Sequence, residues 1–427
     1  LTPALLALLG GRALSAKART ALAAKLAAEE AEADSEDAEL AGSGAGSGGG
    51  DGLHGGTHHE GRGHGWGGLV TRHHWITLAA CTVLLSILAI PAASLKLGLP
   101  DGAYEPHNST AYRTYTAIGD NFGPGRNGPI IAVAKADQAT VAGLDDAKQT
   151  DLELTIGEKL RAVNGVAYVV PVGHSDDRRT MVFQVVPRTG PSEDATAALV
   201  RDLRSAVPSI REATGLSSVG YAGQTVANID ISAALRDALP AYLVVVVGIS
   251  LILLLLVFRS IVVPILATAG FLLSVAAAFG AVVAVYQWGW LSGLFGVEHP
   301  GLVLSFLPTL VIGILFGLAM DYQMFLVSGM REAWAHGHAP RTAVRSGFSH
   351  GARVVTAAAL IMMAVFGSFV HAELTMVRPI GFALAIGVLI DAFVVRMTAM
   401  PAVMHILGEK AWYIPACLLY TSDAADE

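Results

Sequence analysis

The sequence predicts a polytopic α-helical membrane protein that carries an α+β domain outside the membrane. Hydrophobic residues make up 53% of its 427 residues and charged residues only 15%, well below the roughly 25% of soluble domains. The apolar residues also lie together in long runs. The formal net charge of -7 argues against a nucleic-acid-binding protein, which would present a concentrated basic surface. Because Cys81 and Cys417 lie in an apolar run and in the terminal tail, no disulfide framework is predicted.

The membrane spans are predicted from the apolar runs, because one helical crossing of a bilayer needs about 20 mostly apolar residues. One run stands alone, a polar stretch follows, and five runs then come in close succession with short loops between them. Such a series is not expected of buried helices in a soluble core. The six runs are Trp75–Leu95, Pro240–Phe258, Ile261–Tyr286, Leu302–Ser328, Ala352–Val370 and Ile380–Pro401.

The orientation of the spans follows from the positive charges beside them, which are enriched on the cytoplasmic side of a membrane. Loop 287–301 contains no Lys or Arg, and loop 371–379 contains only Arg378. The opposite ends of the spans carry Arg62, Arg72, Arg259, Arg331, Arg341, Arg345, Arg353 and Lys410. Both ends of the chain are therefore predicted to be cytoplasmic, with a tail at 402–416 after the five-span bundle 240–401. The polar stretch 98–237 is predicted to be extracytoplasmic.

Residues 11–73 are predicted to be a flexible cytoplasmic linker before the first span. They include the Gly/Ser tract Gly42–Gly52, whose composition cannot bury enough surface to fold. Histidines follow this tract at His54, His58, His59, His64, His73 and His74. A metal-binding cluster and a solvated His-rich linker are both compatible with them. Since the sequence shows no acidic second shell and no fixed scaffold, we favour the solvated linker and predict no metal site.

The outer domain alternates helix and strand patterns. Strands are expected at 129–136, 165–170, 180–187 and 217–222, and helices at 108–122, 145–163 and 193–207. Ser192 is the expected N-cap of the last helix. The order strand-helix-strand-strand-helix-strand is typical of the ferredoxin-like, split βαβ arrangement. The domain contains no Gly-rich phosphate loop, metal-ligand pattern or nucleophile motif, so neither an enzyme activity nor a cofactor is predicted.

The two ends of the chain suggest a fragment of a longer protein. Pro3–Gly10 aligns without gaps on Pro401–Gly408, with four identical positions, as in transporters built from parallel repeats. Residues 1–10 are therefore expected to be the end of the last helix of a missing first half, and Leu1 in place of Met agrees with this. Residues 417–427 break abruptly from the preceding sequence and resemble a translated sequencing adapter, so they are excluded from the functional interpretation.

Two carboxylates fall at bilayer depth, where an ionisable group costs roughly 2.5–3.5 kcal/mol and is a functional candidate. The first, Asp321, follows Gly313 and Gly317 at steps of four residues, so the three share a helical face that another helix can approach closely. Its carboxylate is expected to point into such a helix–helix seam, where a carboxyl group shielded from water can carry a proton. With the hydroxyl of Tyr322 beside it, a proton relay is predicted, and a purely structural Asp is the alternative.

The second carboxylate, Asp391, repeats part of this pattern. Ala383 and Gly387 share its helical face, and Arg396 follows slightly more than one turn later. We expect a second intramembrane polar site here. Its role stays open between proton transfer and a structural pairing with the arginine near the cytoplasmic surface.

Five stretches of the sequence resemble the MMPL family (mycobacterial membrane protein, large) of the resistance-nodulation-division (RND) superfamily. They occur in the family's order between about Gly68 and Pro415, and this order is more specific than any single motif. The stretches are Phe122–Pro129, Leu256–Pro264, Phe316–Ser328, Thr356–Gly367 and Leu389–Arg396.

The resemblance implies an RND-type half-transporter of the bacterial cytoplasmic membrane. Such transporters have two six-span halves, each with an outer porter domain. An Asp-Tyr pair on the fourth span of each half relays protons and drives the export of lipids or other hydrophobic compounds. Asp321 and Tyr322 match this pair, and the second pair would lie in the missing N-terminal half. Gln323 stands where many relatives have Glu, and Gly329 where Arg is usual. A homotrimer and a monomer both stay open, and no nucleic-acid partner is expected.

Two other functions stay open beside export. An RND-related accessory protein for protein translocation or envelope assembly would have the same spans, and a neighbouring secretion-channel gene would favour it. A non-transporting lipid- or sterol-sensing module is the other. Asp321 weighs against this module, because sensing does not require an acidic residue inside a span.

Overall fold

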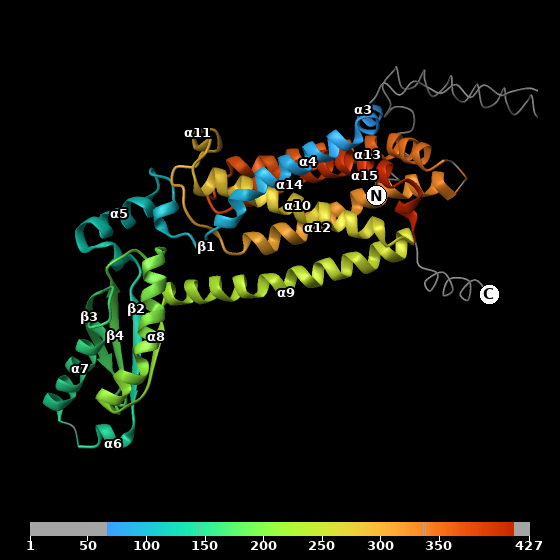
Figure 1. Ribbon diagram of the computed structural model, residues 1–427. Helices are drawn as coiled ribbons and strands as arrows, with labels where there is room; N and C mark the ends of the chain where they lie inside the picture. Colours follow the sequence, from blue (N-terminus) through green and yellow to red (C-terminus); the bar gives the residue numbers. More distant parts are fainter. Residues whose placement is uncertain (1–65, 144, 336, 338, 414–427) are drawn as a thin grey trace, which may run out of the picture. The chain divides into compact units, whose positions relative to one another are not determined.

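The computed structural model describes residues 66–143, 145–335, 337 and 339–413 (Figure 1). The features expected at residues 1–10, 42–52, 54–64 and 417–427 lie outside this part of the chain. Within it, six helical segments are long and apolar enough to cross a membrane. They are His74–Ser94, Gln224–Phe258, Val262–Gln287, Leu307–Trp334, Gly351–His371 and Arg378–Trp412. Each overlaps one of the six predicted runs, so the chain is a multi-pass helical membrane protein.

The spans consist of α-helices that are extended in places by short 3-10 or π segments. The α-helices are α4 (His74–Ala89), α9 (Gln224–Phe258), α10 (Val262–Val282), α12 (Leu307–Ala335), α13 (Pro340–Ser368), α14 (Arg378–Leu389) and α15 (Met400–Leu407). The extensions are η2 (Ile90–Ser94), the π-helix η5 (Val283–Gln287), η6 (Phe369–His371), the π-helix η7 (Ile390–Ala399) and η8 (Gly408–Trp412).

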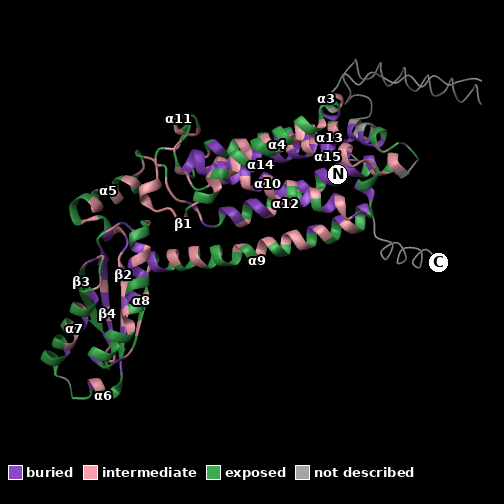
Figure 2. Cartoon of the chain, viewed as in Figure 1, coloured by how far each residue is buried: buried purple, intermediate pink, exposed green. Residues whose placement is uncertain are grey.

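The spans differ in how far neighbouring helices cover them. In the most apolar part of the first and second spans, 11% and 17% of the residues are buried, against 56% in the third span and 61% in the sixth. Figure 2 shows the same contrast between α9 and α10. The shared core of the bundle includes Phe258, Phe271, Val311 and Met404. The exposed apolar side chains of α4 and α9 are those that a bilayer would cover.

Helix α9 begins earlier than predicted. It starts at Gln224 and continues through Pro240, so the expected domain boundary near Asp237 lies inside one unbroken helix. The first turns of α9 belong to the outer domain, because Val226 is part of that domain's core. The hydroxyl of Thr225 also donates to the carbonyl of Gly128 at 3.0 Å. This tertiary packing offsets the hydrogen bond that the proline removes from the helix.

Two shorter segments also differ from the prediction. α12 begins at Leu307 rather than Leu302, because the preceding residues form strand β6 (Val303–Leu304), which pairs in parallel with β1 (Leu97–Gly98). The end of the predicted flexible linker is helical, since α3 covers Trp66–Arg72. His74, expected in the His-rich linker region, is the first residue of α4.

The outer domain contains a four-stranded sheet in the order β3-β4-β2-β5, and all its pairings are antiparallel. Its elements are α5 (Thr110–Phe122), η4 (Pro124–Asn127), β2 (Ile130–Ala136), α6 (Gln138–Val141), α7 (Asp146–Arg161), β3 (Val166–His174), β4 (Thr180–Pro187), α8 (Asp194–Thr214) and β5 (Leu216–Ala222). Ile131 of β2 pairs with Gln184 on one side and with Ala222 on the other. Alternate residues of β2 are buried, which is typical of a sheet with one face on the core. Leu160 and Phe183 lie in that core.

Helix α8 is longer than predicted. The sequence pattern ends this helix at Val207, but in the structure it runs through Pro208 to Thr214. Leu203 and Ile210, on either side of the proline, are both buried in the domain core. Their packing holds the helix together where proline removes a backbone hydrogen bond.

The predicted N-cap of α8 is wrong. The residue before its first turn is Glu193, whose side-chain oxygen accepts a hydrogen bond from the backbone N–H of Gly190 at 2.6 Å. The hydroxyl of Ser192 instead donates to the carboxylate of Asp101 at 2.8 Å. This bond joins the start of α8 to the segment that follows the first span.

Candidate functional site in the membrane bundle

Helix α12 presents three consecutive polar side chains in the fourth span. Successive residues of an α-helix are rotated by about 100°, so neighbours in the sequence face different surroundings. In the structure Asp321 is exposed, whereas Tyr322 and Gln323 are 4% and 1% exposed. The helix therefore turns Tyr322 and Gln323 into the bundle and Asp321 away from it.

The face of α12 that carries Asp321 is mostly uncovered in the part of the chain that the structure describes. Gly313 is close to the hydroxyl of Tyr242 of α9, which would lie 2.8 Å from an added Cβ. A Cβ on Gly317 would meet no atom within 4 Å. The helix–helix seam into which Asp321 is expected to point therefore stays a prediction. Among the described residues, Tyr242 approaches this face at Gly313, and no atom approaches it at Gly317.

Tyr322 is buried behind this open face. Its hydroxyl has no hydrogen-bond partner among the described residues, and it does not donate to the neighbouring carboxylate of Asp321. A buried hydroxyl of this kind requires an explanation.

Asp391 lies in a buried polar network with the arginine that the sequence placed beside it. Arg396 Nε donates to Asp391 Oδ2 at 3.1 Å, and Arg396 Nη1 donates to Gln323 Oε1 of α12. Asp391 and Arg396 are 3% and 1% exposed. The network therefore joins the sixth span to the fourth and sets one positive charge against one negative charge in the core.

The hydrogen bonds of this network do not use all of its polar atoms. Four buried atoms have no protein partner within the described ranges: Tyr322 Oη, Gln323 Nε2, Asp391 Oδ1 and Arg396 Nη2. Unsatisfied buried polar groups are rare in native structures and are costly. Their concentration in four side chains marks this part of the bundle as a site where protons or water molecules can be accepted.

A π-helix brings Asp391 and Arg396 together. The two residues are five positions apart, and in an α-helix they would lie about 140° apart around the axis. Residues Ile390–Ala399 are wound as the π-helix η7, in which hydrogen bonds join residues five apart. This winding brings the two side chains close enough for Arg396 to donate to Asp391 while it also reaches Gln323 of α12. Short π segments inside α-helices occur frequently at functional sites.

The small residues before Asp391 lie in a closed seam. Ala383 is fully buried, and a Cβ on Gly387 would lie 2.5 Å from Leu315 Cδ1 of α12. The close approach of α14 and α12 at this point allows Arg396 to reach Gln323. Of the two small-residue faces identified in the sequence, the one that leads to Asp391 is therefore closed and the one that leads to Asp321 is open.

A second group of polar side chains lies in the loops outside the spans and was not predicted. His107 Nδ1 lies 2.7 Å from Glu298 Oε2, and the same oxygen accepts the backbone N–H of His107 at 2.9 Å. These bonds from the His107 backbone and ring hold the pKa of Glu298 below its usual range. Burial, followed by the charge of His107, lowers the pKa of His299. The sequence signal was weak, because His107 and Glu298 are 191 positions apart.

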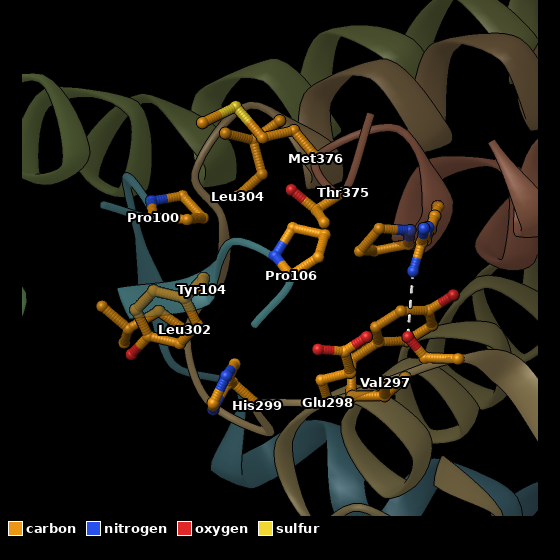
Figure 3. Close-up of a pocket in the computed structure, with 14 residues that line it drawn as sticks. Pro100, Tyr104, Pro106, Val297, Glu298, His299, Leu302, Leu304, Thr375 and Met376 are labelled. Carbon is orange, nitrogen blue, oxygen red and sulfur yellow. Dashed lines mark hydrogen bonds between the residues drawn. The ribbon is translucent and has the colours of Figure 1, made fainter. Parts of the chain in front are cut away.

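Glu298 and His299 also line a pocket between three loops at this end of the bundle (Figure 3). Its other walls are mainly apolar or aromatic, and they include Pro100, Tyr104, Pro106, Leu302, Leu304 and Met376. Arg378, which also lines the pocket, donates to the carbonyls of Ala372 and Gly296 at 2.7 and 2.9 Å. The pocket is thus an apolar recess with polar groups on its wall.

The sequence matches the model of the MMPL family over residues 103–419. It is 41% identical over 354 residues to membrane protein YdfJ of Bacillus subtilis, an alignment that covers 83% of this chain and 47% of that protein. It is 31% identical over 367 residues to the heme uptake protein MmpL11 of Mycobacterium tuberculosis, with 84% and 37% covered. It is 28% identical over 370 residues to the trehalose monomycolate exporter MmpL3 of the same species, an alignment that covers 82% of this chain and 37% of that protein. The chain thus spans half or less of the length of these relatives.

Proposed function

The chain belongs to the MMPL family, and we propose that it forms one half of a transporter that uses the proton-motive force to export lipids or other hydrophobic compounds. Asp321 and Tyr322 form the proton relay of this half. Asp391 and Arg396 form a second polar site that responds to it. Each charge that crosses the membrane supplies roughly 2.3 kcal/mol per 100 mV, so a few protons can drive the movement of a hydrophobic molecule.

The observation that carries this proposal is the position of Asp321. A carboxylate on an uncovered, otherwise apolar face of a span is costly in lipid, and the described residues provide it with neither a hydrogen bond nor an ion pair. Directly beside it, the buried hydroxyl of Tyr322 has no protein partner within the described chain. A group that must take up and release a proton cannot be held permanently in an ion pair, and Asp321 meets this condition.

A second half of the transporter would cover the open face of α12. Gly317 leaves space on this face, and small residues allow a neighbouring helix to approach closely. YdfJ, about twice as long as the aligned part of this chain, has room for such a half. We infer that Asp321 faces the equivalent helix of the second half, with the relay at the junction of the two.

The outer domain is the proposed porter domain, and we assign it to the ferredoxin-like class. Its element order and its sheet order β3-β4-β2-β5 support this assignment. With the ends of the chain in the cytoplasm, this domain lies outside the cytoplasmic membrane. There it would receive cargo from the outer ends of the spans.

The names of the relatives support a hydrophobic cargo. One relative is named as an exporter of trehalose monomycolate, a lipid, and another as a heme uptake protein. Both molecules have large apolar surfaces, although the two names give opposite directions of transport. We propose export, because it is the direction that proton entry from outside would drive in an antiporter.

The test is transport by the complete transporter in proteoliposomes with an imposed pH gradient. Movement of a fluorescent lipid and release of the gradient are measured together. We expect Asp321→Asn to abolish both, whereas the control Asp237→Asn, at an exposed carboxylate of α9, leaves both near the parental rate. Gradient-driven lipid transport that persists in Asp321→Asn would refute the relay. Gradient-independent lipid movement by the parent would refute proton coupling as a whole.

A further inference from the structure

Three metal-ligating side chains meet where two separate extramembrane segments come together. His107 precedes α5, and Glu298 and His299 lie between α11 (Ser292–Phe295) and β6. One ligand atom from each of the three lies within 4.8 Å of the others. His107 and Glu298 are exposed and His299 is partly buried, so an ion could enter from solvent. These residues are distinct from the proposed proton relay.

The rings of this cluster are held in place by their neighbours. Tyr112 of α5 stacks on His299 with ring centres 4.9 Å apart, and its edge contacts His107 at 4.8 Å. The two imidazoles are themselves 4.3 Å apart. The backbone N–H of His107 fixes one oxygen of Glu298. Metal sites depend on this kind of support, because it orients the ligands before the ion binds.

His299 provides the most direct indication of a missing ligand. Its Nε2 is a buried nitrogen without a hydrogen-bond partner among the described residues. An imidazole nitrogen in this position is available as a lone-pair donor or as a proton donor. One ligand atom each of His107, Glu298 and His299 lies within 4.8 Å of the others, so a cation could contact all three residues at once.

We propose that His107, Glu298 and His299 bind a divalent transition-metal ion of the zinc class. Two imidazoles and one carboxylate are a known three-ligand set for Zn²⁺ that leaves a fourth position open. Imidazole ligands favour zinc, copper or nickel over magnesium and calcium. Ligand atoms about 2.1 Å from a tetrahedral ion are about 3.4 Å apart, so the side chains need only a small adjustment.

The bound ion would connect the segment after the first span to the loop between the third and fourth spans. In this structure the connection consists of the hydrogen bonds between His107 and Glu298. On metal binding, His107 would either lose the hydrogen bond between its Nδ1 and Glu298 or turn its ring. Glu298 would then bind the ion in place of this hydrogen bond. The metal ion would therefore link two segments that border the pocket in Figure 3.

The experiment measures the unfolding temperature of the purified full-length chain with and without Zn²⁺. An ion that binds only the folded state raises this temperature. Zn²⁺ bound by histidines of a linker, which bind it equally in the folded and unfolded states, leaves the temperature unchanged. We expect Zn²⁺ to stabilise the parent and to have no such effect on His299→Ala or Glu298→Gln. The matched control is His174→Ala, which removes a His–carboxylate pair with Glu153 of similar length, 2.8 Å. This control should respond to Zn²⁺ like the parent.

Equal responses of parent and site variants, or no response of the parent, would overturn the proposal. A second measurement on the unaltered chain covers the case in which a variant does not fold. Histidine modification by diethyl pyrocarbonate is quantified by mass spectrometry with and without Zn²⁺. The proposal requires protection of His107 and His299 while the exposed His371 is modified as before. Unchanged modification of His107 and His299 would refute it.

Discussion

Asp321 and Asp391 are both carboxylates in apolar spans, yet the structure places them in opposite environments. Asp391 is 3% exposed and forms an ion pair with Arg396. Asp321 is exposed on an open face and has no ion pair in the described chain. A buried, paired carboxylate holds helices in one arrangement, whereas an unpaired one is free to change its protonation state. We infer that Asp391 stabilises the arrangement of the bundle. Asp321 instead changes its protonation state, on a face that the second half of the transporter would cover.

The two residues are connected through α12. Asp321 and Gln323 are two positions apart, which places them about 160° apart around the helix. Gln323 accepts a hydrogen bond from Arg396, and Tyr322 lies between the two directions. A rotation or tilt of α12 that accompanies protonation of Asp321 would therefore act directly on the buried network.

Removal of one partner of the buried ion pair should destabilise the bundle more than any other change considered below. Arg396→Met leaves Asp391 uncompensated in the core and should lower the free energy of unfolding by about 3–5 kcal/mol. The double variant Asp391→Leu with Arg396→Met removes both charges and should recover most of this loss. Denaturant unfolding of the detergent-purified chain measures both. A stable Arg396→Met variant would contradict the role assigned to the pair.

Gln323 and Met324 are neighbours on α12, but only Gln323 faces the buried network. Gln323→Ala removes an acceptor from a buried arginine, and hydrogen bonds to charged groups are worth about 1.5–3 kcal/mol. Met324→Ala, at the adjacent exposed residue, should change stability by no more than about 0.5 kcal/mol. Denaturant unfolding of the detergent-purified variants measures both changes. Equal losses in the two variants would show that α12 does not face the bundle as described.

The two glycine faces should differ in their tolerance of a larger side chain. Gly387→Val places a Cβ against Leu315 and should cost about 1–3 kcal/mol through overpacking. A Cβ added at Gly317 meets no atom within 4 Å, so Gly317→Val should change the stability of this chain by less than about 0.5 kcal/mol. In the complete transporter, Gly317→Val should impair assembly, because the proposed second half approaches there. Co-purification of the two halves, expressed as separate chains, tests this point, and normal assembly would argue against the proposed contact.

The spans and the strands could be predicted from the sequence because each depends on a local pattern. Apolar runs of about 20 residues identified the six spans, and Thr180–Pro187 was predicted with its observed bounds. Helix ends at prolines were less predictable. Both Pro208 and Pro240 lie inside helices, since tertiary packing compensates for the missing N–H.

The candidate site could be predicted only as far as helical spacing allows. Spacing showed that Gly313, Gly317 and Asp321 share a face, but it does not tell which face is covered. The contact of Arg396 with Gln323 joins residues 73 positions apart, and no local pattern indicates it. The π-helix that aligns Asp391 with Arg396 depends on a shift in backbone hydrogen bonding, and no residue type marks such a shift in the sequence.

The environments of the two carboxylates can be compared directly by carbodiimide labelling. A hydrophobic carbodiimide reacts with accessible carboxyl groups in a membrane, and mass spectrometry locates the adducts in the detergent-purified chain. We expect modification of Asp321 and protection of Asp391 at the same reagent concentration. Protection of Asp321 together with modification of Asp391 would contradict the orientation of α12 on which the proposed relay depends.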